Sequence, residues 1–372
     1  MSDENHVLKI LIVTTVKVGF DGLTNHIMSY VSNMDKSDII IDLVSARGID
    51  ENFIPTLNKI GFNKIIRLEF RDKKPFKYYR ALKKVIKNEQ YDVVHVHGNS
   101  ATLAIDLLAA KHAKCKVRIA HSHNTKCDHQ MANIILKPFF RHAYTHAFAC
   151  GEEAGKWMFG NQKFRIIKNA KDIDKYIFSQ QKRNEFRKKL KLDDSTIAIG
   201  NVAAFVSKKN HLFLIDSFNE LIQKKDNYEL FLFGIDGDSL DAVLERINVL
   251  NLKDKVHYMG TRDNIEDYLN AMDLMALPSI FEGFPVSVLE WQINGLKCLI
   301  SDTITRDCDI LGNALFLPID HGSIVWTKAI LDADLNRSDA DIKSLFVNAG
   351  FDIKTNSLVL KNYYKTFAGL GE

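Results

Sequence analysis

A regular alternation between apolar runs and helical patterns constrains the fold of this chain more than any other feature. Short apolar runs predict strands at 8–15, 39–44 and 92–97, and segments with apolar residues at helical spacing follow in turn. Strands that alternate with helices indicate a parallel sheet that helices cover on both faces. The predicted fold class is therefore α/β, with doubly wound sheets.

The alternation occurs twice, and a polar, lysine-rich segment at 171–195 separates the two series. A length of 372 residues fits two domains of ordinary size. We predict Rossmann-like domains at 1–170 and 171–355, and a final helix at about 356–372 that packs back on the first. Open parallel sheets bind ligands at the carboxyl ends of their strands, so two facing sheets predict a cleft between the domains.

The composition, 46% hydrophobic and 26% charged, is typical of a soluble globular protein. No window approaches about 20 consecutive apolar residues, and the first residues are polar and acidic, unlike a signal peptide. We therefore expect a cytoplasmic protein. Its five cysteines are odd in number, scattered and without a CxxC pair, so neither a disulfide framework nor a zinc ribbon is expected.

The stretch 278–295 has the pattern of a ligand-binding turn. It follows a predicted buried strand and leads into a predicted helix with Pro285 in its first turn. Free N–H groups and the helix dipole favour an anion there. Glu282 and Glu290 bracket the turn and would repel phosphate, so their expected ligands are hydroxyls. The stretch predicts a pocket for a phosphate attached to a sugar; an ordinary turn with two surface acids is the alternative.

Three other loops after predicted strands carry weaker signals. Gly19 and Gly22 allow a ligand to approach the backbone closely. The lysine pair that ends at Lys209 is suited to meet phosphate oxygens, although such a pair is more often solvated. Gly234 and Gly237 lie in the loop after another predicted strand, where glycines usually form only a turn before a helix. Alternating aspartates are attributed to N-caps and Asx turns rather than to metal sites, at 172/174, 236/238 and 307/309.

Histidines cluster at the ends of two predicted strands: His95, His97, His121 and His123, with His129 soon after. Side chains two residues apart on a strand point to one face, which is a geometry for metal ligands. No carboxylate lies at ligand spacing with them, and histidines at strand ends also bond to bound polar groups. Contact with a ligand by at least one histidine is therefore favoured over a metal site.

A basic stripe is the most specific physical pattern outside the turn at 278–295. Five basic residues recur every three or four positions on a predicted helix near 73–88: Lys73, Lys77, Arg80, Lys84 and Lys87. The opposite side is expected to be core: Tyr79, Leu82, Val85 and Ile86. The stripe is either a solvated surface or a dock for anionic lipid or nucleic acid. Because no stacking aromatics interleave it, nucleic acid is disfavoured.

Taken together, these motifs resemble the retaining glycosyltransferases of family 4, which have the GT-B fold. The resemblance runs nearly end to end, and its most specific part is the E-x7-E spacing of EGFPVSVLE at 282–290. Also similar are YDVVHVHG (91–98), RIAHSHN (118–124), NAKDIDKY (169–176), SKKNHLFLIDSF (207–218) and MGTRDNIEDYLNAMDLMALPS (259–279). Bacterial capsular and exopolysaccharide transferases are the most similar group.

The resemblance implies a nucleotide diphosphate sugar as donor, with a UDP-sugar favoured over a GDP-sugar, and no metal or other cofactor. Glu282 would hold donor-sugar hydroxyls, Glu290 the ribose hydroxyls, and His123 the sugar near the reacting centre. Lys209 would balance the charge that develops on the leaving phosphate. The other donor-binding residues that it implies are Gly19, Gly22, Gly234, Gly237, Gly283, Phe284, Val286 and Ser287.

Two positions depart from the family pattern. Ala204 stands where the family usually has an arginine, and Asp21 stands where a second glycine is common. The leading hypothesis is an active transferase that builds a surface polysaccharide on a lipid-linked or saccharide acceptor, with the basic stripe on the inner face of the membrane. One alternative is a catalytically weak relative that acts as a regulatory or assembly subunit of a partner glycosyltransferase. Another is a nucleotide-sugar epimerase or hydrolase.

Overall fold

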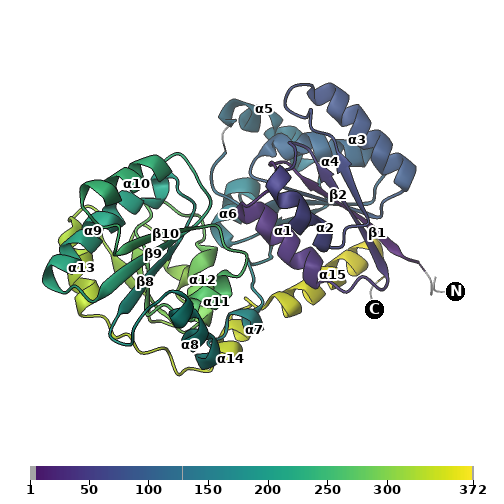
Figure 1. Ribbon diagram of the computed structural model, residues 1–372. Coiled ribbons are helices and arrows are strands. Elements are labelled where there is room, and N and C mark those ends of the chain that lie inside the picture. Colours follow the sequence, from purple (N-terminus) through teal and green to yellow (C-terminus); the bar gives the residue numbers. More distant parts are fainter. Residues whose placement is uncertain (1–5, 128, 371–372) are drawn as a thin grey trace. The chain divides into compact units, whose positions relative to one another are not determined.

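The computed structural model of the protein describes residues 6–127 and 129–370 (Figure 1). The chain divides into two compact units. Unit 1 comprises Met1–Ala170 and Gly350–Glu372, and unit 2 comprises Lys171–Ala349. Each unit is built around one sheet, and all described strand pairs are parallel. The predicted α/β fold class is confirmed.

The sheet of unit 1 has seven strands in the order β3-β2-β1-β4-β5-β6-β7. Its central strands are buried on both sides, which explains their continuous apolar runs. Because the strands are parallel, the loops that follow them meet at one edge of the sheet. The strands are β1 (Leu8–Thr14), β2 (Ile39–Ser45), β3 (Lys64–Arg67), β4 (Val93–Gly98), β5 (Val117–Ser122), β6 (His146–Ala149) and β7 (Arg165–Ile166).

Helices cover both faces of this sheet through two separate hydrophobic clusters. One cluster joins the sheet to α1 (Gly22–Asn33), α2 (Ile54–Lys59) and α15 (Ile353–Ala368). The other joins it to α3 (Pro75–Glu89), α4 (Ala104–His112), α5 (Gln130–Arg141) and α6 (Glu152–Phe159). In Figure 1, the C-terminal helix α15, in yellow, lies beside the N-terminal helix α1.

Polar contacts hold α15 against unit 1. The ammonium group of Lys361 is buried and lies 2.6 Å from carboxylate oxygens of both Asp35 and Asp38. The hydroxyl of Ser357 donates a hydrogen bond of 3.2 Å to the backbone carbonyl of Tyr30. The last helix of the chain is therefore part of the first unit.

The sheet of unit 2 has six strands in the order β10-β9-β8-β11-β12-β13. They are β8 (Ile197–Val202), β9 (Tyr228–Phe233), β10 (Val256–Gly260), β11 (Leu274–Leu277), β12 (Lys297–Ser301) and β13 (Leu315–Leu317). One hydrophobic cluster joins the sheet to α9 (His211–Lys224), α10 (Leu240–Val249) and α13 (Ser323–Leu331). The remaining helices of unit 2 are α7 (Ile173–Tyr176), α8 (Gln180–Lys189), α11 (Ile265–Leu269), α12 (Val286–Ile293) and α14 (Ile342–Asn348).

One predicted segment differs from the observed structure. The segment 171–195 forms α7 and α8 rather than a plain connection. The helix α8 was not predicted because this segment is rich in charged residues. Two of these residues, Arg183 and Arg187, pair with the carboxylate of Asp273.

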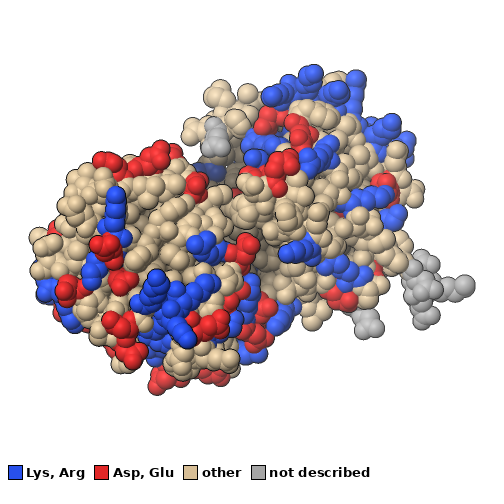
Figure 2. Space-filling model, viewed as in Figure 1, with Lys and Arg blue, Asp and Glu red and all other residues tan. Residues whose placement is uncertain are grey.

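Four of the five residues of the basic stripe lie on α3, Lys73 lies in the turn just before it, and all five side chains are exposed. Figure 2 shows Lys and Arg gathered over this part of unit 1. The opposite face buries Tyr78, whose hydroxyl donates to Asp106 at 2.6 Å, and Tyr79 is only half-buried. The expected absence of aromatics is also wrong, because the exposed Phe76 ring lies 4.3 Å from the Arg80 guanidinium. Within the described residues, no helix is both long and apolar enough to span a bilayer.

Candidate active site

The turn between β11 and α12 carries the two glutamates that the sequence singled out. All of β11 is buried, and α12 begins directly after the loop that carries Glu282. Pro285 occupies the position just before the helix rather than its first turn. The N-terminal amides of α12 and the positive end of its dipole therefore lie at this loop, an arrangement that favours an anion.

Glu282 accepts two polar contacts through the same carboxylate oxygen, Oε1. The ammonium group of Lys209 forms an ion pair with it, and the hydroxyl of Ser279 donates a hydrogen bond of 2.8 Å. Lys209 comes from the loop after β8, so the ion pair joins two loops at the same edge of the sheet. A backbone hydrogen bond of 2.8 Å from Ile280 to the carbonyl of Lys208 ties the loops together as well.

Glu290 lies on α12 and is buried. Its Oε1 lies 2.5 Å from the ammonium group of Lys171 and accepts a hydrogen bond of 3.2 Å from the hydroxyl of Tyr176. Burial, with the charge of Glu290, raises the pKa of Tyr176 well above its usual value, so this hydroxyl stays a donor. Among the described residues, no hydrogen bond reaches Oε2 of Glu282 or Glu290, so each retains acceptor capacity for a ligand hydroxyl.

Sequence reasoning missed Lys171 and Tyr176 as partners of Glu290. Both lie in the stretch NAKDIDKY, which was recognised as similar to the family without a role for its residues. The similarity of this stretch to the family was visible in the sequence. However, more than a hundred positions separate Lys171 and Tyr176 from Glu290, and no local pattern connects them.

Gly234 and Gly237 are explained by the packing of two loops. A Cβ atom at Gly234 would lie 1.9 Å from the carbonyl oxygen of Ala203, and one at Gly237 would lie 2.4 Å from that of Phe205. Any larger residue would push the loop after β9 away from the loop after β8. Ala204 lies in the latter loop, half-buried, and Lys208 is exposed.

The glycine loop of unit 1 places Asp21 at the N-terminus of α1. Its carboxylate accepts hydrogen bonds from the backbone N–H groups of Leu23, at 2.9 Å, and Thr24, at 3.1 Å. The acid that departs from the family pattern therefore caps a helix, which is a favourable place for a negative charge. A Cβ atom at Gly22 would meet nothing within 4 Å, so packing within the protein does not require glycine there.

The structure brings four of the predicted histidines together at the ends of β4 and β5. Nε2 of His95 lies 3.1 Å from Nδ1 of His121, and Nδ1 of His97 lies 2.9 Å from Nε2 of His123. His129 does not join them; it is exposed at the start of α5. The clustering comes from the parallel pairing of β4 with β5, which sets the two HxH pairs side by side.

His26 of α1 completes this histidine cluster, and sequence reasoning missed it. Its ring lies edge-on to those of His121 and His123, with centroids 5.0 and 4.8 Å away. Burial lowers the pKa of His26 to about 4 and lowers those of the other four well below 6.5. All five imidazoles are therefore neutral near pH 7. His123, which is half-buried, would meet a ligand as a neutral hydrogen-bonding group.

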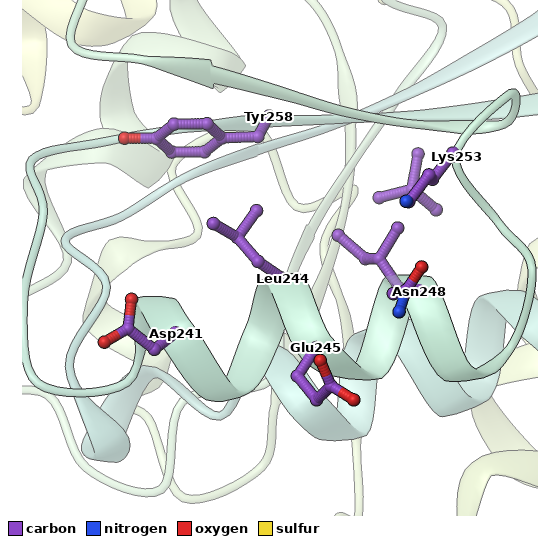
Figure 3. A pocket seen from close by; sticks show the side chains of 8 residues that line it. Asp241, Leu244, Glu245, Asn248, Lys253 and Tyr258 are labelled. Atoms are coloured by element: carbon purple, nitrogen blue, oxygen red, sulfur yellow. The ribbon is translucent and has the colours of Figure 1, made fainter.

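Two hollows show where ligands of different character would fit. One, of about 400 Å³, lies between α10 and β10 in unit 2 and includes none of the predicted site residues. Figure 3 shows its acidic side chains Asp241 and Glu245 on α10, on the far side of Leu244 from Tyr258. The other, of about 150 Å³, lies at the loops after the strands of unit 1 and is lined by basic and polar side chains, among them Arg47, Arg71, Asn99, Asn124, Lys126 and His129.

Of the aspartates that were attributed to turns, Asp309 accepts hydrogen bonds from the backbone N–H groups of Asn313 and Ala314, at 3.1 and 3.2 Å. Asp238 and Asp236 instead have partners far away in the chain: Asp238 accepts a hydrogen bond of 3.1 Å from the backbone of Ser207, and Asp236 accepts one from the hydroxyl of Tyr258. Among the described residues, the groups of three or more side chains that could hold a metal ion consist of histidines alone.

Comparison with known proteins gives matches to two family models. Residues 20–174 match the model described as Glycosyltransferase Family 4, and residues 182–325 match Glycosyl transferases group 1. EpsF of Bacillus subtilis (strain 168), which is classified as a glycosyltransferase, is 28% identical over 92% of this chain and 93% of its own length.

Two further comparisons concern a relative whose name specifies its sugar donor and a solved structure with a similar fold. The UDP-Gal:alpha-D-GlcNAc-diphosphoundecaprenol alpha-1,3-galactosyltransferase of Escherichia coli is 27% identical over 63% of this chain and 64% of its own. The crystal structure of HepE of Anabaena, which holds UDP, superimposes with a TM-score of 0.75 over 96% of this chain and 100% of that chain, at 15% identity. These comparisons do not favour a regulatory subunit, an epimerase or a hydrolase. The chain belongs to glycosyltransferase family 4, has the GT-B fold and is a glycosyltransferase.

Proposed function

We propose that this enzyme transfers a sugar, with retention of configuration, from a UDP-sugar to a lipid-linked saccharide in the synthesis of a surface polysaccharide. One observation carries the proposal: Glu282, paired with Lys209, and Glu290 flank the N-terminus of α12 in unit 2. The E. coli relative, whose name specifies UDP-Gal and a diphosphoundecaprenol acceptor, supports this choice of donor and acceptor.

The donor site is proposed to lie at the start of α12. The backbone around Gly283, Phe284, Val286 and Ser287 meets the diphosphate, where the helix dipole favours negative charge. Oε2 of Glu290 accepts hydrogen bonds from the ribose hydroxyls. Lys171 and Tyr176 hold the other oxygen of this carboxylate and so orient it.

The transfer step needs positive charge on the leaving phosphate. As the bond between the anomeric carbon and the UDP oxygen breaks, negative charge grows on that oxygen, and the ammonium group of Lys209 balances it. The acceptor oxygen attacks from the same face, and its proton passes to the departing phosphate. Glu282 holds a hydroxyl of the sugar and also keeps Lys209 in place. We propose that Lys209 and the start of α12 supply this charge without a metal ion.

The contributions of unit 1 are proposed from the family resemblance. His123 contacts the transferred sugar as a neutral imidazole that His97 holds through a hydrogen bond of 2.9 Å. Gly19 and Gly22 lie in a loop proposed to close over the phosphate. The basic hollow near Arg47 and Lys126 is suited to the phosphates of a lipid-linked acceptor.

We also propose that the enzyme works at the cytoplasmic face of the membrane. The basic stripe on α3 is exposed, and α5 exposes a face of large apolar side chains: Met131, Ile134, Ile135 and Phe139. Both helices lie on the same side of the unit 1 sheet, and α4 contacts each of them. Cations beside exposed apolar side chains are the combination that binds an anionic bilayer surface.

Nucleotide-sugar binding and turnover test the proposed function. The purified enzyme would be mixed with UDP- and GDP-sugars, and thermal shift and nucleotide release would be followed with and without a lipid-linked saccharide. We expect stabilisation by UDP-sugars and acceptor-dependent release of UDP. Failure to bind any nucleotide would overturn the proposal. Binding without turnover, in the presence of acceptor, would contradict the proposed transfer and favour the catalytically weak alternative.

A further inference from the structure

The histidine cluster of unit 1 contains buried nitrogen atoms that lack partners. Nε2 of His26, of His97 and of His121 is buried and makes no hydrogen bond within the described residues. Buried polar atoms in proteins almost always have a partner, and an exception points to a water or an ion. Three such atoms in one cluster indicate a site that is built to bind something.

Three of these rings are held in the way that metal-binding histidines are held. A metal-bound histidine normally uses its second ring nitrogen for a hydrogen bond to a neighbouring group. Nδ1 of His26 lies 2.8 Å from the side-chain oxygen of Asn169, Nδ1 of His121 lies 3.1 Å from His95, and Nε2 of His123 lies 2.9 Å from His97. These bonds leave Nε2 of His26, Nε2 of His121 and Nδ1 of His123 for a ligand.

We propose that His26, His121 and His123 bind a transition-metal ion that prefers imidazole, with Zn²⁺ as the expected ion. One ring nitrogen from each of the three lies within 4.8 Å of the others. Zinc–imidazole bonds of about 2.0–2.1 Å require nitrogens roughly 3.3 Å apart, so small ring rotations suffice. Three histidines leave a fourth position for water, as in other three-histidine zinc sites.

A second group of histidines is less suitable. His95, His97 and His121 also lie close together, and all three are buried. His95 already uses both ring nitrogens, because its Nδ1 lies 2.7 Å from the hydroxyl of Tyr364 and its Nε2 bonds to His121. It orients His121 rather than binding the ion.

The ion would act on the enzyme by occupying His123 and takes no part in the transfer chemistry. Under the proposed function, His123 contacts the sugar, so bound zinc would slow transfer. This consequence rests on the proposed function, whereas zinc binding itself does not. The two can fail separately, because donor binding is assigned to unit 2 and the histidines belong to unit 1.

Metal titration of the full chain tests the site. The enzyme, stripped with a chelator, would be titrated with Co²⁺, whose visible absorption reports its ligands, and then with competing Zn²⁺. We expect one ion per chain, bands typical of nitrogen and oxygen ligands, and displacement by Zn²⁺. If the folded wild-type chain shows no such bands, the proposal is overturned. An intense thiolate charge-transfer band would place the ion on cysteine and also overturn it.

Two variants and a control locate the ion. His26→Gln and His123→Gln should each weaken Co²⁺ binding at least tenfold, while His321→Asn, an exposed position of unit 2, should not change it. Circular dichroism and thermal unfolding, measured on the same samples, report whether each variant is folded. Equal Co²⁺ affinity in all three variants would show an adventitious ion only. In turnover assays, Zn²⁺ should inhibit the wild type and lose its effect on His26→Gln.

Discussion

The ammonium group of Lys209 and the carboxylate of Glu282 form an ion pair across two loops of unit 2. Both side chains are largely buried, at 17% and 10% exposure, so neither charge is well solvated without the other. Removal of one partner from such a pair leaves a poorly solvated charge. The pair therefore holds the donor loops in position while it keeps a cation beside the proposed phosphate.

Replacement of Lys209 by methionine should abolish most of the transfer activity. The variant keeps the length of the side chain but removes the cation that balances the leaving phosphate, a kind of loss that costs about 10²–10³ in kcat. Steady-state kinetics with UDP-sugar and acceptor measure it. Lys224→Met, an exposed position at the end of α9, is the matched control. Full activity of the Lys209 variant would remove this residue from the mechanism.

The two glutamates should differ in what they bind. Glu290→Ala removes hydrogen bonds to the ribose, each worth about 1.5–3 kcal/mol for a charged acceptor, and should weaken UDP binding at least tenfold. Glu282→Ala should leave UDP affinity within a few-fold and mainly lower kcat. Calorimetric titration with UDP separates the two. Glu245→Ala, an exposed acid of α10, serves as the control. Equal losses of UDP affinity at Glu282 and Glu290 would contradict the assigned roles.

Arginine at position 204 should raise turnover. Its guanidinium would add a charge-assisted hydrogen bond to the diphosphate, and the half-exposed position leaves room for a longer side chain. We expect kcat/KM to rise about tenfold, which corresponds to roughly 1.4 kcal/mol. The test compares Ala204→Arg in the wild type and in Lys208→Ala. If Lys208 stands in for the missing arginine, Lys208→Ala alone lowers turnover and the double variant restores it. Unchanged turnover in both backgrounds would show that alanine at position 204 does not lower the activity of the enzyme.

The fold could be predicted because its signals are local. β11 is a run of four buried apolar residues, and Glu282 and Glu290 are recognisable by their spacing on one short segment. The parallel pairing of β4 with β5 brings the two HxH pairs together. The predicted domain boundaries and donor contacts remain predictions, and the experiments above address the donor contacts.

The contacts that could not be predicted join residues that lie far apart in the chain. Nothing local indicates that Lys171 and Tyr176 orient Glu290, or that His26 of α1 completes the histidine cluster. A single histidine on an amphipathic helix carries no signal of its own. In the sequence, Asp21 is recognisable only as a departure from the family pattern, whereas the structure uses its charge to cap α1.

The histidine cluster should make unit 1 sensitive to acid. The folded pKa of His26 is about 4 against 6.5 unfolded, so above pH 6.5 neither state is protonated and stability does not change. As pH falls from 6.5 to 4, the unfolded state binds the proton first, and His26 alone costs about 3 kcal/mol. His95, His97, His121 and His123 add to the loss in the same direction.

Hydrogen exchange on chelator-treated enzyme measures this effect within unit 1. Protection of the β4 and β5 amides should fall steeply between pH 6.5 and 5, after correction for intrinsic exchange rates. His26→Gln should reduce the slope, and His321→Asn, exposed in unit 2, should leave it unchanged. A slope that is the same for the wild type and the His26 variant would contradict the prediction.

Membrane binding should depend on α5 and α3 together. Ile135 and Phe139 are 61% and 56% exposed, so Ile135→Ser with Phe139→Ser removes apolar surface without disturbing the core. We expect flotation with anionic vesicles to fall at least tenfold in this variant and in Lys77→Glu with Lys84→Glu. Binding of the wild type should also be lost at high salt, where screening weakens the charge attraction. Leu358→Ser, 58% exposed on α15, is the matched control and should float as the wild type does. Flotation that is insensitive to both double variants would show that this side of unit 1 does not face the membrane.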